Sequence, residues 1–384
     1  MTRSSVSLTF LLAGAMASMP VVMVGHILAE NYGTIAALIA IGIGNTLLCA
    51  VGFMMARLAL KYRATTSDTV GRLGGGTLSK VFGVAMVVSM LGWFVVQCSV
   101  LVDFAQGYCP AAPQALLVLL IGASLILTTM GDIKRLFVFS EKLGPLILLS
   151  CLAMFMWSIV DAQIVQGSQD TIAFLPALSL VLATSLGVVI DVPTYYRIAS
   201  SRKEAFLSLF IVIWLVTSVV QVLGVILVSQ YSLTELIMSP FGIVLAVSGW
   251  LMNVNNLYSA VVSSQTLFKW GGFALRSIVF GGIGLMIVGL HAGESLATTI
   301  EAITLGISSM GGVMIACVVT ERRSALALGC AWLIGVLIGG LGLTGSIALT
   351  GAAQIDAFSS AGVASTLFLI GVQLWQSQLS TNSN

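Results

Sequence analysis

Two polar side chains in an otherwise apolar run could bind a flat, polar ring. Trp93 and Gln97 lie four residues apart, so on a helix they share one face. An indole can stack on a heterocycle, and the neighbouring carboxamide can donate and accept hydrogen bonds at the edge of that ring. The pair would serve equally well as a packing aromatic residue and an interhelical hydrogen bond, and the spacing leaves both interpretations open.

Three asparagines occur together in a second apolar run, from Trp250 to Tyr258. Amide groups are unfavourable in lipid unless they find partners. Asn253, Asn255 and Asn256 therefore predict that part of this segment lines a polar cavity. Asn253 and Asn256 share a helix face, whereas Asn255 points elsewhere, and we expect it to bridge helices.

One carboxylate lies clearly inside an apolar run. Asp191 stands between Gly187 and Pro193, and a central Asp costs about 2.5–3.5 kcal/mol on membrane-insertion scales. If the helix breaks here, the freed backbone N–H groups can solvate the carboxylate. Three roles fit this position: a protonatable coupling group, a counter-ion to a cationic group, or a cap for the second half-helix.

The composition indicates which elements must position these side chains. Of 384 residues, 58% are hydrophobic and 8% are charged, against roughly 25% charged in a soluble domain. The mean hydropathy is +1.08. We therefore expect an all-α polytopic membrane protein. A net charge of +2 argues against a nucleic-acid partner, and the sequence has no His, Cys and carboxylate cluster that would predict a metal or a cofactor.

Apolar segments of spanning length number about twelve. The first follows Arg3 and continues to Leu28, so it is interpreted as a spanning helix rather than a signal peptide. The gaps between segments are too short for a separate soluble domain. The predicted spans are 7–28, 34–56, 80–105, 113–130, 136–160, 174–198, 205–229, 240–266, 274–290, 296–319, 325–347 and 357–374.

The distribution of charge predicts the orientation in the membrane. With twelve spans and both termini inside, all 16 Lys and Arg residues fall on the cytoplasmic side, as the positive-inside rule requires. We therefore expect a multi-pass protein of the inner (plasma) membrane with cytoplasmic N- and C-termini. The opposite loops carry acidic residues without Lys or Arg: Glu30, Asp103, Asp161, Asp170, Glu235, Glu294 and Asp356.

The first and sixth spans both contain helix-breaking residues. Gly14, Pro20 and Gly25 lie in the first, and Gly187 and Pro193 in the sixth. Because the two spans are five helices apart, the halves of the chain would be inverted relative to each other. Broken helices expose backbone groups that are tolerated in a membrane only beside a cavity or a ligand. The matched pair indicates the substrate site of a LeuT-like transporter, with ordinary kinks as the alternative.

Five short segments, in order along the chain, resemble motifs of one transporter family. Each is short, and their order and spacing make the set more specific than any one of them. They are Gly42-Ile43-Gly44-Asn45, Leu91-Gly92-Trp93-Phe94, Pro193-Thr194-Tyr195-Tyr196-Arg197, Asn253-Val254-Asn255-Asn256-Leu257-Tyr258 and Ser309-Met310-Gly311-Gly312-Val313-Met314-Ile315-Ala316. The family is the nucleobase–cation symporters, which includes cytosine, hydantoin and allantoin permeases.

This resemblance implies a LeuT-like fold and alternating access. Two inverted five-helix repeats would occupy residues 1–163 and 164–323, and two additional helices would follow in residues 324–384. The substrate site would lie between helices one, three, six and eight.

The resemblance also implies roles for individual residues. The substrate ring would stack on Trp93 and would be hydrogen-bonded by Gln97 and by Asn253 or Asn255. Backbone groups around Gly187 would complete the site.

The sequence departs from the family at positions that bear on ion coupling. Sodium-coupled members place two hydroxyl residues just before the eighth-helix Asn, where this chain has Leu251 and Met252. Thr194 replaces the acid of the P-D-Y motif, and Asp191 occurs three residues earlier. We therefore expect coupling to H+ rather than Na+, through Asp191. Ser308-Ser309 replaces a Pro-Pro pair in the tenth helix, so this helix would move differently.

These observations predict a secondary active transporter that imports a nucleobase-like heterocycle by alternating access. The alternative within transport is an amino-acid or amine carrier of the same fold, since Asp191 would suit an amine. An integral-membrane enzyme is a weaker alternative, because the sequence has no D-x-x-D, H-E-x-x-H or Ser/His/Asp set. A channel lacks support from any repeated filter motif. No catalytic residues are predicted.

Overall fold

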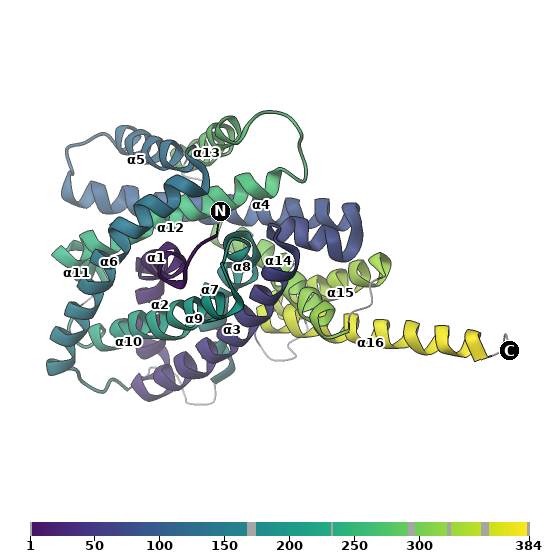
Figure 1. Cartoon of the computed structure of the whole chain (residues 1–384). Coiled ribbons are helices and arrows are strands. Elements are labelled where there is room, and N and C mark those ends of the chain that lie inside the picture. The colour runs from purple at the N-terminus through teal and green to yellow at the C-terminus, as the bar shows by residue number, and fades with distance from the viewer. Residues whose placement is uncertain are drawn as a thin grey trace.

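The computed structural model describes residues 2–166, 174–231, 233–290, 296–320, 324–346 and 353–381, and these ranges are almost entirely helical (Figure 1). The helices are α1 (Ser5–Met16), α2 (Met19–Tyr32), α3 (Thr34–Tyr62), α4 (Thr66–Tyr108), α5 (Gln114–Thr129), α6 (Asp132–Ser158), α7 (Phe174–Ile190), α8 (Val192–Tyr196), α9 (Arg202–Leu209), α10 (Thr217–Leu227), α11 (Leu233–Met238), α12 (Pro240–Ser264), α13 (Phe273–Gly289), α14 (Leu296–Thr320), α15 (Ala325–Leu343) and α16 (Ala353–Thr381).

Every predicted span coincides with a helix or with a set of consecutive helices in this series. By length and apolarity, six of the described helical segments can each cross a membrane, and the bent pair α1–α2 makes a seventh. The all-α membrane architecture is thus confirmed, whereas the count of twelve spans remains a prediction. The shorter apolar helices α5 and α13 pack against each other at one edge of the bundle (Figure 1).

The first span is broken, as predicted. Helices α1 and α2 meet at 56° across Ala17 and Ser18. Pro20 lies in the first turn of α2, where its missing N–H does no harm but prevents α1 from continuing. The glycines have a different role from the predicted one. Gly14 lies against Gly144 of α6, so it permits close packing inside α1 rather than the break.

Close packing also explains Gly25. It lies within α2, and a Cβ there would overlap the carbonyl oxygen of Gln221 in α10. Gly224 of α10 faces the carbonyl of Val22 in the same way. Two helix backbones in direct contact are typical of small residues at membrane helix interfaces. The pair Gly25 and Gly224 therefore holds the second half of the broken span against α10.

The sixth span breaks at Asp191, between α7 and α8. Pro193 lies in the first turn of α8, and the N–H of Asp191 still donates to the carbonyl of Gly187 at 3.1 Å. The helix is thus interrupted between Gly187 and Pro193, as predicted, but only at one residue, and Ala177–Tyr196 still forms one membrane-spanning segment that is less bent than the pair α1–α2. The second half, α8, has only five residues.

Helix α4 begins earlier than predicted. Gly75, with φ +86°, bends it so that residues 66–74 form a short helix at an angle to the main span. The predicted span began at residue 80, and the preceding segment was expected to be a basic loop. Thr65 caps this short helix by accepting from the N–H of Asp68 at 3.2 Å. The bend positions Thr66 near the break of the sixth span.

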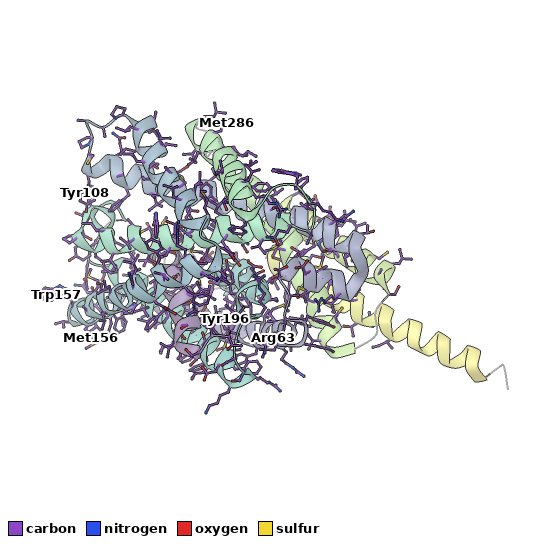
Figure 2. The ribbon with its side chains drawn as sticks, turned by 45° about the horizontal axis from the view of Figure 1, so that its top comes forward. Arg63, Tyr108, Met156, Trp157, Tyr196 and Met286 are labelled. Atoms are coloured by element: carbon purple, nitrogen blue, oxygen red, sulfur yellow. The ribbon has the colours of Figure 1, made fainter. Side chains whose placement is uncertain are left out.

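The outside of the bundle is apolar. Trp157, Met286 and Met156 are 73%, 61% and 59% exposed, and they project from its surface (Figure 2). Exposed apolar side chains spread over long helices are what a lipid environment requires, since hydrocarbon is the surrounding solvent there.

Basic segments that are distant in sequence meet at one end of the bundle, which we call the basic end. The backbone of Arg3 pairs with the segment after α8: its N–H donates to the carbonyl of Ile198 at 2.8 Å, and its carbonyl accepts from Ser200 at 2.9 Å. The Arg3 guanidinium forms an ion pair with Glu141 at 3.2 Å and lies 4.5 Å from the ring centre of Phe137.

Two further contacts close the basic end. The N–H of Ser5 donates to Glu204. The guanidinium of Arg63, at the end of α3, donates to the carbonyls of Arg197 and Ala199. The convergence of these segments agrees with the predicted grouping of Lys and Arg on one side, which the sequence assigns to the cytoplasm.

Some charged residues do not fit the predicted loops. Asp356 was expected in an outer loop, but it lies in the first turn of α16 and is buried at 1% exposure. Arg276 is also buried, and its guanidinium donates to the carbonyls of Phe268 and Trp270. Asp170, Glu294, Arg322 and Arg323 lie outside the described residues.

Candidate substrate and coupling site

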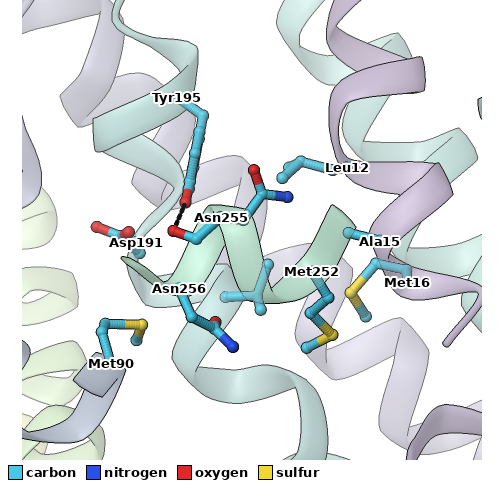
Figure 3. A pocket seen from close by; sticks show the side chains of 10 residues that line it. Leu12, Ala15, Met16, Met90, Asp191, Tyr195, Met252, Asn255 and Asn256 are labelled. Atoms are coloured by element: carbon cyan, nitrogen blue, oxygen red, sulfur yellow. Dashed lines mark hydrogen bonds between the residues drawn. The ribbon is translucent and has the colours of Figure 1, made fainter. Parts of the chain in front are cut away.

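A small cavity lies where the two broken spans meet α4 and α12. Its volume is about 20 Å³, close to the space that one water requires. The cavity must therefore widen before it can hold a heterocycle. We call it the central cavity (Figure 3). Its lining residues are Leu12, Ala15 and Met16 of α1, Met90 of α4, Val188 of α7, Asp191, Tyr195 of α8, and Met252, Asn255 and Asn256 of α12.

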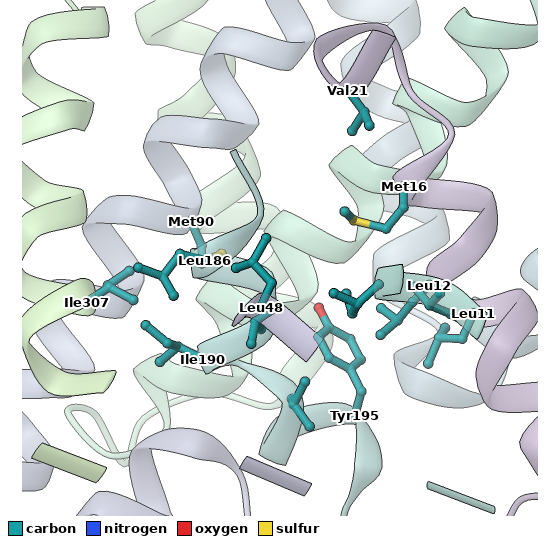
Figure 4. Packing of buried hydrophobic residues seen from close by; sticks show 14 of the residues in the cluster. Leu11, Leu12, Met16, Val21, Leu48, Met90, Leu186, Ile190, Tyr195 and Ile307 are labelled. Atoms are coloured by element: carbon teal, nitrogen blue, oxygen red, sulfur yellow. The ribbon is translucent and has the colours of Figure 1, made fainter. Parts of the chain in front are cut away.

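Apolar side chains pack tightly behind this lining (Figure 4). Leu48 and Ile190 are fully buried, as is Ile307, and they lie beside lining residues such as Met90. Three methionines, Met16, Met90 and Met252, line the central cavity itself. Methionine is unbranched and adapts to irregular shapes, so this wall can adjust when the cavity widens.

Two of the three asparagines of α12 line the central cavity. They are Asn255 and Asn256, whereas Asn253 turns toward α4 and donates to the carbonyl of Phe94 at 3.1 Å. Asn253 and Asn256, which the spacing placed on one helix face, thus differ in their surroundings, and Asn255, which was expected to bridge helices, lines the cavity. From Leu251 to Ser264 every residue of α12 is buried, so no single polar face identifies the cavity side.

The two cavity asparagines present unsatisfied polar atoms. Asn255 Oδ1 and Asn256 Nδ2 are both buried and have no hydrogen-bond partner within the described part of the chain. Buried amide groups are nearly always paired, with protein, water or ligand. One acceptor and one donor on adjacent residues therefore suit a ligand that offers both a donor and an acceptor.

The residues of the predicted ring-binding pair are apart from this cavity. Gln97 lines a second, larger cavity of about 340 Å³, together with Met19, Pro20 and Met23 of α2 and residues of α4, α11 and α12. Trp93 is half-buried and lines neither cavity. Gly187 is near the central cavity, because a Cβ on it would lie 3.8 Å from the methyl group of Met90.

Asp191 is held by three hydroxyl groups from three different elements. Thr66 of the short helix in α4 donates to Oδ1 at 2.6 Å, and Thr194 of α8 donates to the same oxygen at 2.6 Å. Ser259 of α12 donates to Oδ2. The carboxylate is 1% exposed. The carboxylate is therefore stabilised by hydroxyl groups, rather than by the freed backbone N–H groups expected from the sequence. The side chain of Asp191 makes no hydrogen bond that caps α8.

Several site residues escaped the sequence analysis. Tyr195 lines the central cavity, and its hydroxyl donates to the carbonyl of Asn255 at 3.0 Å. Its spacing of four from Asp191 could have indicated a shared face. Ser259 is likewise four residues after Asn255. Nothing in the sequence around Thr66 points to Asp191, because that contact depends on the bend at Gly75.

The side of α12 that faces the first broken span presents a thioether and a hydrocarbon at Met252 and Leu251. Met252 Sδ accepts from the Ser18 hydroxyl at 3.3 Å, and Leu251 packs against Gly14. The hydroxyl of Ser248, one turn earlier, donates to the carbonyl of Gly14. A hard cation requires several oxygen ligands, and two of the side chains here are a thioether and a hydrocarbon.

Neither a protein-family model nor a curated protein matches the sequence. Solved structures match over nearly its whole length. Mhp1, a nucleobase-cation-symport-1 family transporter in a closed conformation with bromovinylhydantoin bound, gives a TM-score of 0.73 at 16% identity, over 98% of this chain and 93% of that chain. A Na+-coupled sialic acid symporter in a substrate-bound, outward-open state gives a TM-score of 0.69 at 12% identity. The match covers 96% of this chain and 90% of that chain.

MhsT in complex with L-phenylalanine gives a TM-score of 0.62 at 14% identity, over 94% of this chain and 97% of that chain. At these identities the likeness establishes the fold. The chain is a multi-pass membrane protein with the fold of secondary transporters. The match to Mhp1 supports, at the level of the fold, the resemblance found in the sequence. The first two of these structures are a transporter and a symporter, in agreement with the prediction of a transporter rather than an enzyme.

Proposed function

We propose that this protein is a nucleobase–cation symporter that imports a nucleobase-like heterocycle by alternating access. The observation that carries the proposal is the central cavity between two broken spans, with Asn255 and Asn256 presenting one free acceptor and one free donor. The ring edge of a nucleobase or hydantoin offers both N–H donors and carbonyl acceptors, so it is complementary to this pair. That Mhp1 binds bromovinylhydantoin in the same fold supports this substrate class.

Transport requires the central cavity to open alternately to the two sides. In this structure it admits about one water, and at the basic end Arg3 is bonded to Glu141 and to the segment 198–200. In this proposal Gln97 contacts the substrate while the substrate is in the larger cavity, either before it enters the central cavity or after it leaves. Trp93 contributes only if α4 rotates as the cavity widens.

Proton coupling through Asp191 is part of the proposal. The carboxylate joins the short helix of α4, α8 and α12 through hydroxyl donors. Protonation would remove the charge that these donors stabilise and loosen the three elements together. The thioether and hydrocarbon of Met252 and Leu251, at the first break, favour H+ over Na+ as the coupling ion.

The test is uptake of labelled cytosine, uracil, hydantoin and purines by cells that lack their own permeases. We expect accumulation of at least one of these compounds, and a loss of more than tenfold in Asn256→Ala if its amide supplies a ring hydrogen bond in the transported complex. Asn31→Ala, at the outer end of α2 and away from both cavities, is the matched control. Equal uptake by both variants would contradict the assigned site.

An amine or amino-acid carrier is the second candidate, because an acidic side chain lines the central cavity. The structure of MhsT with L-phenylalanine shows an amino acid bound in this fold. This candidate would be favoured if correctly inserted protein takes up labelled amines or amino acids and takes up none of the labelled heterocycles. Competition by unlabelled cytosine against every labelled compound separates the two.

A further inference from the structure

An apolar trough opens on the side of the bundle between α3, α7, α14 and α16. Its volume is about 260 Å³, and no polar surface lines it. Leu47 is 46% exposed at its rim, so the trough faces the surroundings of the protein. The lining residues are Leu47, Leu48, Ala50, Val51 and Met54 of α3, Leu182 and Leu186 of α7, Ile315 of α14, and Ile355 and Phe358 of α16.

A basic cavity of about 420 Å³ lies further along α3 and α14. Arg57, Lys61, Arg63 and Arg202 line it, with Cys317 and Val318 of α14. The four basic side chains are exposed. Within the described residues, no carboxylate forms an ion pair with any of them. The cavity therefore gathers four cationic side chains, of which Arg63 also donates to the carbonyls of Arg197 and Ala199.

The trough and the basic cavity follow one stripe of the protein surface. On α3, Met54 of the trough precedes Arg57 of the basic cavity by three residues, and Lys61 follows four residues later, so all three share a face. On α14, Ile315 of the trough precedes Val318 of the basic cavity by three residues, so these two also share a face. From Leu47 to Met54 the helix rises about 10 Å, comparable to the roughly 15 Å depth of hydrocarbon in one leaflet.

We propose that this stripe binds an anionic phospholipid, with its phosphate headgroup in the basic cavity and an acyl chain in the apolar trough. The basic end is the predicted cytoplasmic side, where anionic lipids attract juxtamembrane Lys and Arg. A water-soluble phosphate would leave the apolar trough unused, and a neutral lipid would supply no negative charge to the four cations. Only a molecule with an anionic head and a hydrocarbon chain matches both parts.

The bound lipid would touch a helix that also lines the central cavity. Leu182 and Leu186 of α7 line the trough, whereas Val188, two residues on, lines the central cavity. Helix α7 is therefore the shared wall between the lipid site and the central cavity. The inference does not depend on the identity of the transported substrate.

The test measures lipid retained by the purified full-length protein in native mass spectrometry. Dioleoyl phosphatidylglycerol and dioleoyl phosphatidylcholine, which have the same chains, are offered in equal amounts. We expect preferential retention of phosphatidylglycerol, and about a ten- to thirtyfold weaker retention in the double variant Arg57→Gln/Lys61→Gln, from the loss of two cations near the membrane surface. Lys80→Gln/Lys134→Gln removes the same charge away from the cavity and should retain the lipid.

A second variant tests the trough without changing charge. Ala50→Trp places an indole in the trough, so we expect weaker retention of phosphatidylglycerol in this variant as well. Glycerophosphoglycerol, the headgroup without chains, should not be retained by the unmodified protein. Equal retention of the two lipids, an equal loss in the Lys80/Lys134 control, or full retention in Ala50→Trp would overturn the proposal. Retention of the headgroup alone would instead indicate a site for a water-soluble phosphate.

Discussion

At the scale of single residues, the most informative group is the carboxylate of Asp191. It is buried with hydroxyl donors from Thr66, Thr194 and Ser259 and with no cation in hydrogen-bonding contact among the described residues. A buried carboxylate is stabilised only by what surrounds it. A neutral hydroxyl set supports the charged form less than an Arg or Lys partner would, which suits a group that must gain and lose a proton.

We predict that Asp191→Asn removes the dependence of transport on the proton gradient. The amide is nearly isosteric but cannot exchange a proton, so uptake should no longer rise when the external pH is lowered, while binding of substrate persists. The measurement is initial uptake rate against external pH, beside exchange of preloaded substrate. Asp132→Asn, an exposed acid at the start of α6, is the control. An unchanged pH profile in Asp191→Asn would exclude this residue as the coupling group.

The residues of the candidate site could be predicted by type but only partly by position. The amides of α12 and the acid of the sixth span were found because polar groups are unfavourable in lipid and are therefore rare there unless they have a role. Which amide faces the cavity could not be found, because α12 is buried on every side over this stretch. The partners of Asp191 were missed for another reason: Thr66 is distant in sequence, and a bend at Gly75 brings it near.

At the scale of helices, the broken first span is held by direct backbone contact as well as by side chains. Gly25 of α2 faces Gln221 of α10, and the carboxamide of Gln221 accepts from Asn45 of α3 at 2.8 Å. This arrangement joins α10 to both α2 and α3. The break itself was predictable from Pro20. The role of the glycines in packing was not, because the residues that contact a glycine lie far away in the sequence.

We predict that Gly25→Ala destabilises the protein, because its methyl group would overlap the backbone of α10. Overpacking of this kind typically costs about 1–3 kcal/mol. Gly42→Ala is the matched control, since a Cβ at Gly42 has open space around it and alanine favours the helix. Thermal unfolding in detergent, followed by size-exclusion chromatography, should show a lower midpoint for Gly25→Ala alone. Equal midpoints would mean that α2 and α10 separate readily.

At the scale of the whole molecule, the fold is that of secondary transporters, and the order of apolar segments predicted it well. Each predicted span corresponds to observed helices, because a membrane helix satisfies its own backbone and therefore depends mainly on local sequence. The division into inverted repeats at residue 163 and the count of twelve spans remain predictions. The tilt and packing of the helices depend on contacts between distant segments, so the sequence indicated a polar cavity near the broken spans but not its size or its full lining.

We predict that Cys109, exposed between α4 and α5, faces the outside of the cell. A membrane-impermeant maleimide should label it in intact cells, and Cys109→Ser should abolish this labelling. A cysteine introduced at Lys80, on the other side of the same span, should react only after the membrane is permeabilised. The reverse pattern would show that the orientation inferred from Lys and Arg is wrong.

The contacts of the first residues also bear on the order in which the protein can fold during synthesis. Arg3 is paired with residues 198–200, and Ser5 with Glu204, so these contacts cannot form until about half of the chain has been made, later than the ion pair of Arg3 with Glu141. Contacts so distant in sequence form late and slowly. The first helix to leave the ribosome thus completes its contacts only after much later segments have been made, and the environment of α1 until then is lipid rather than its final neighbours.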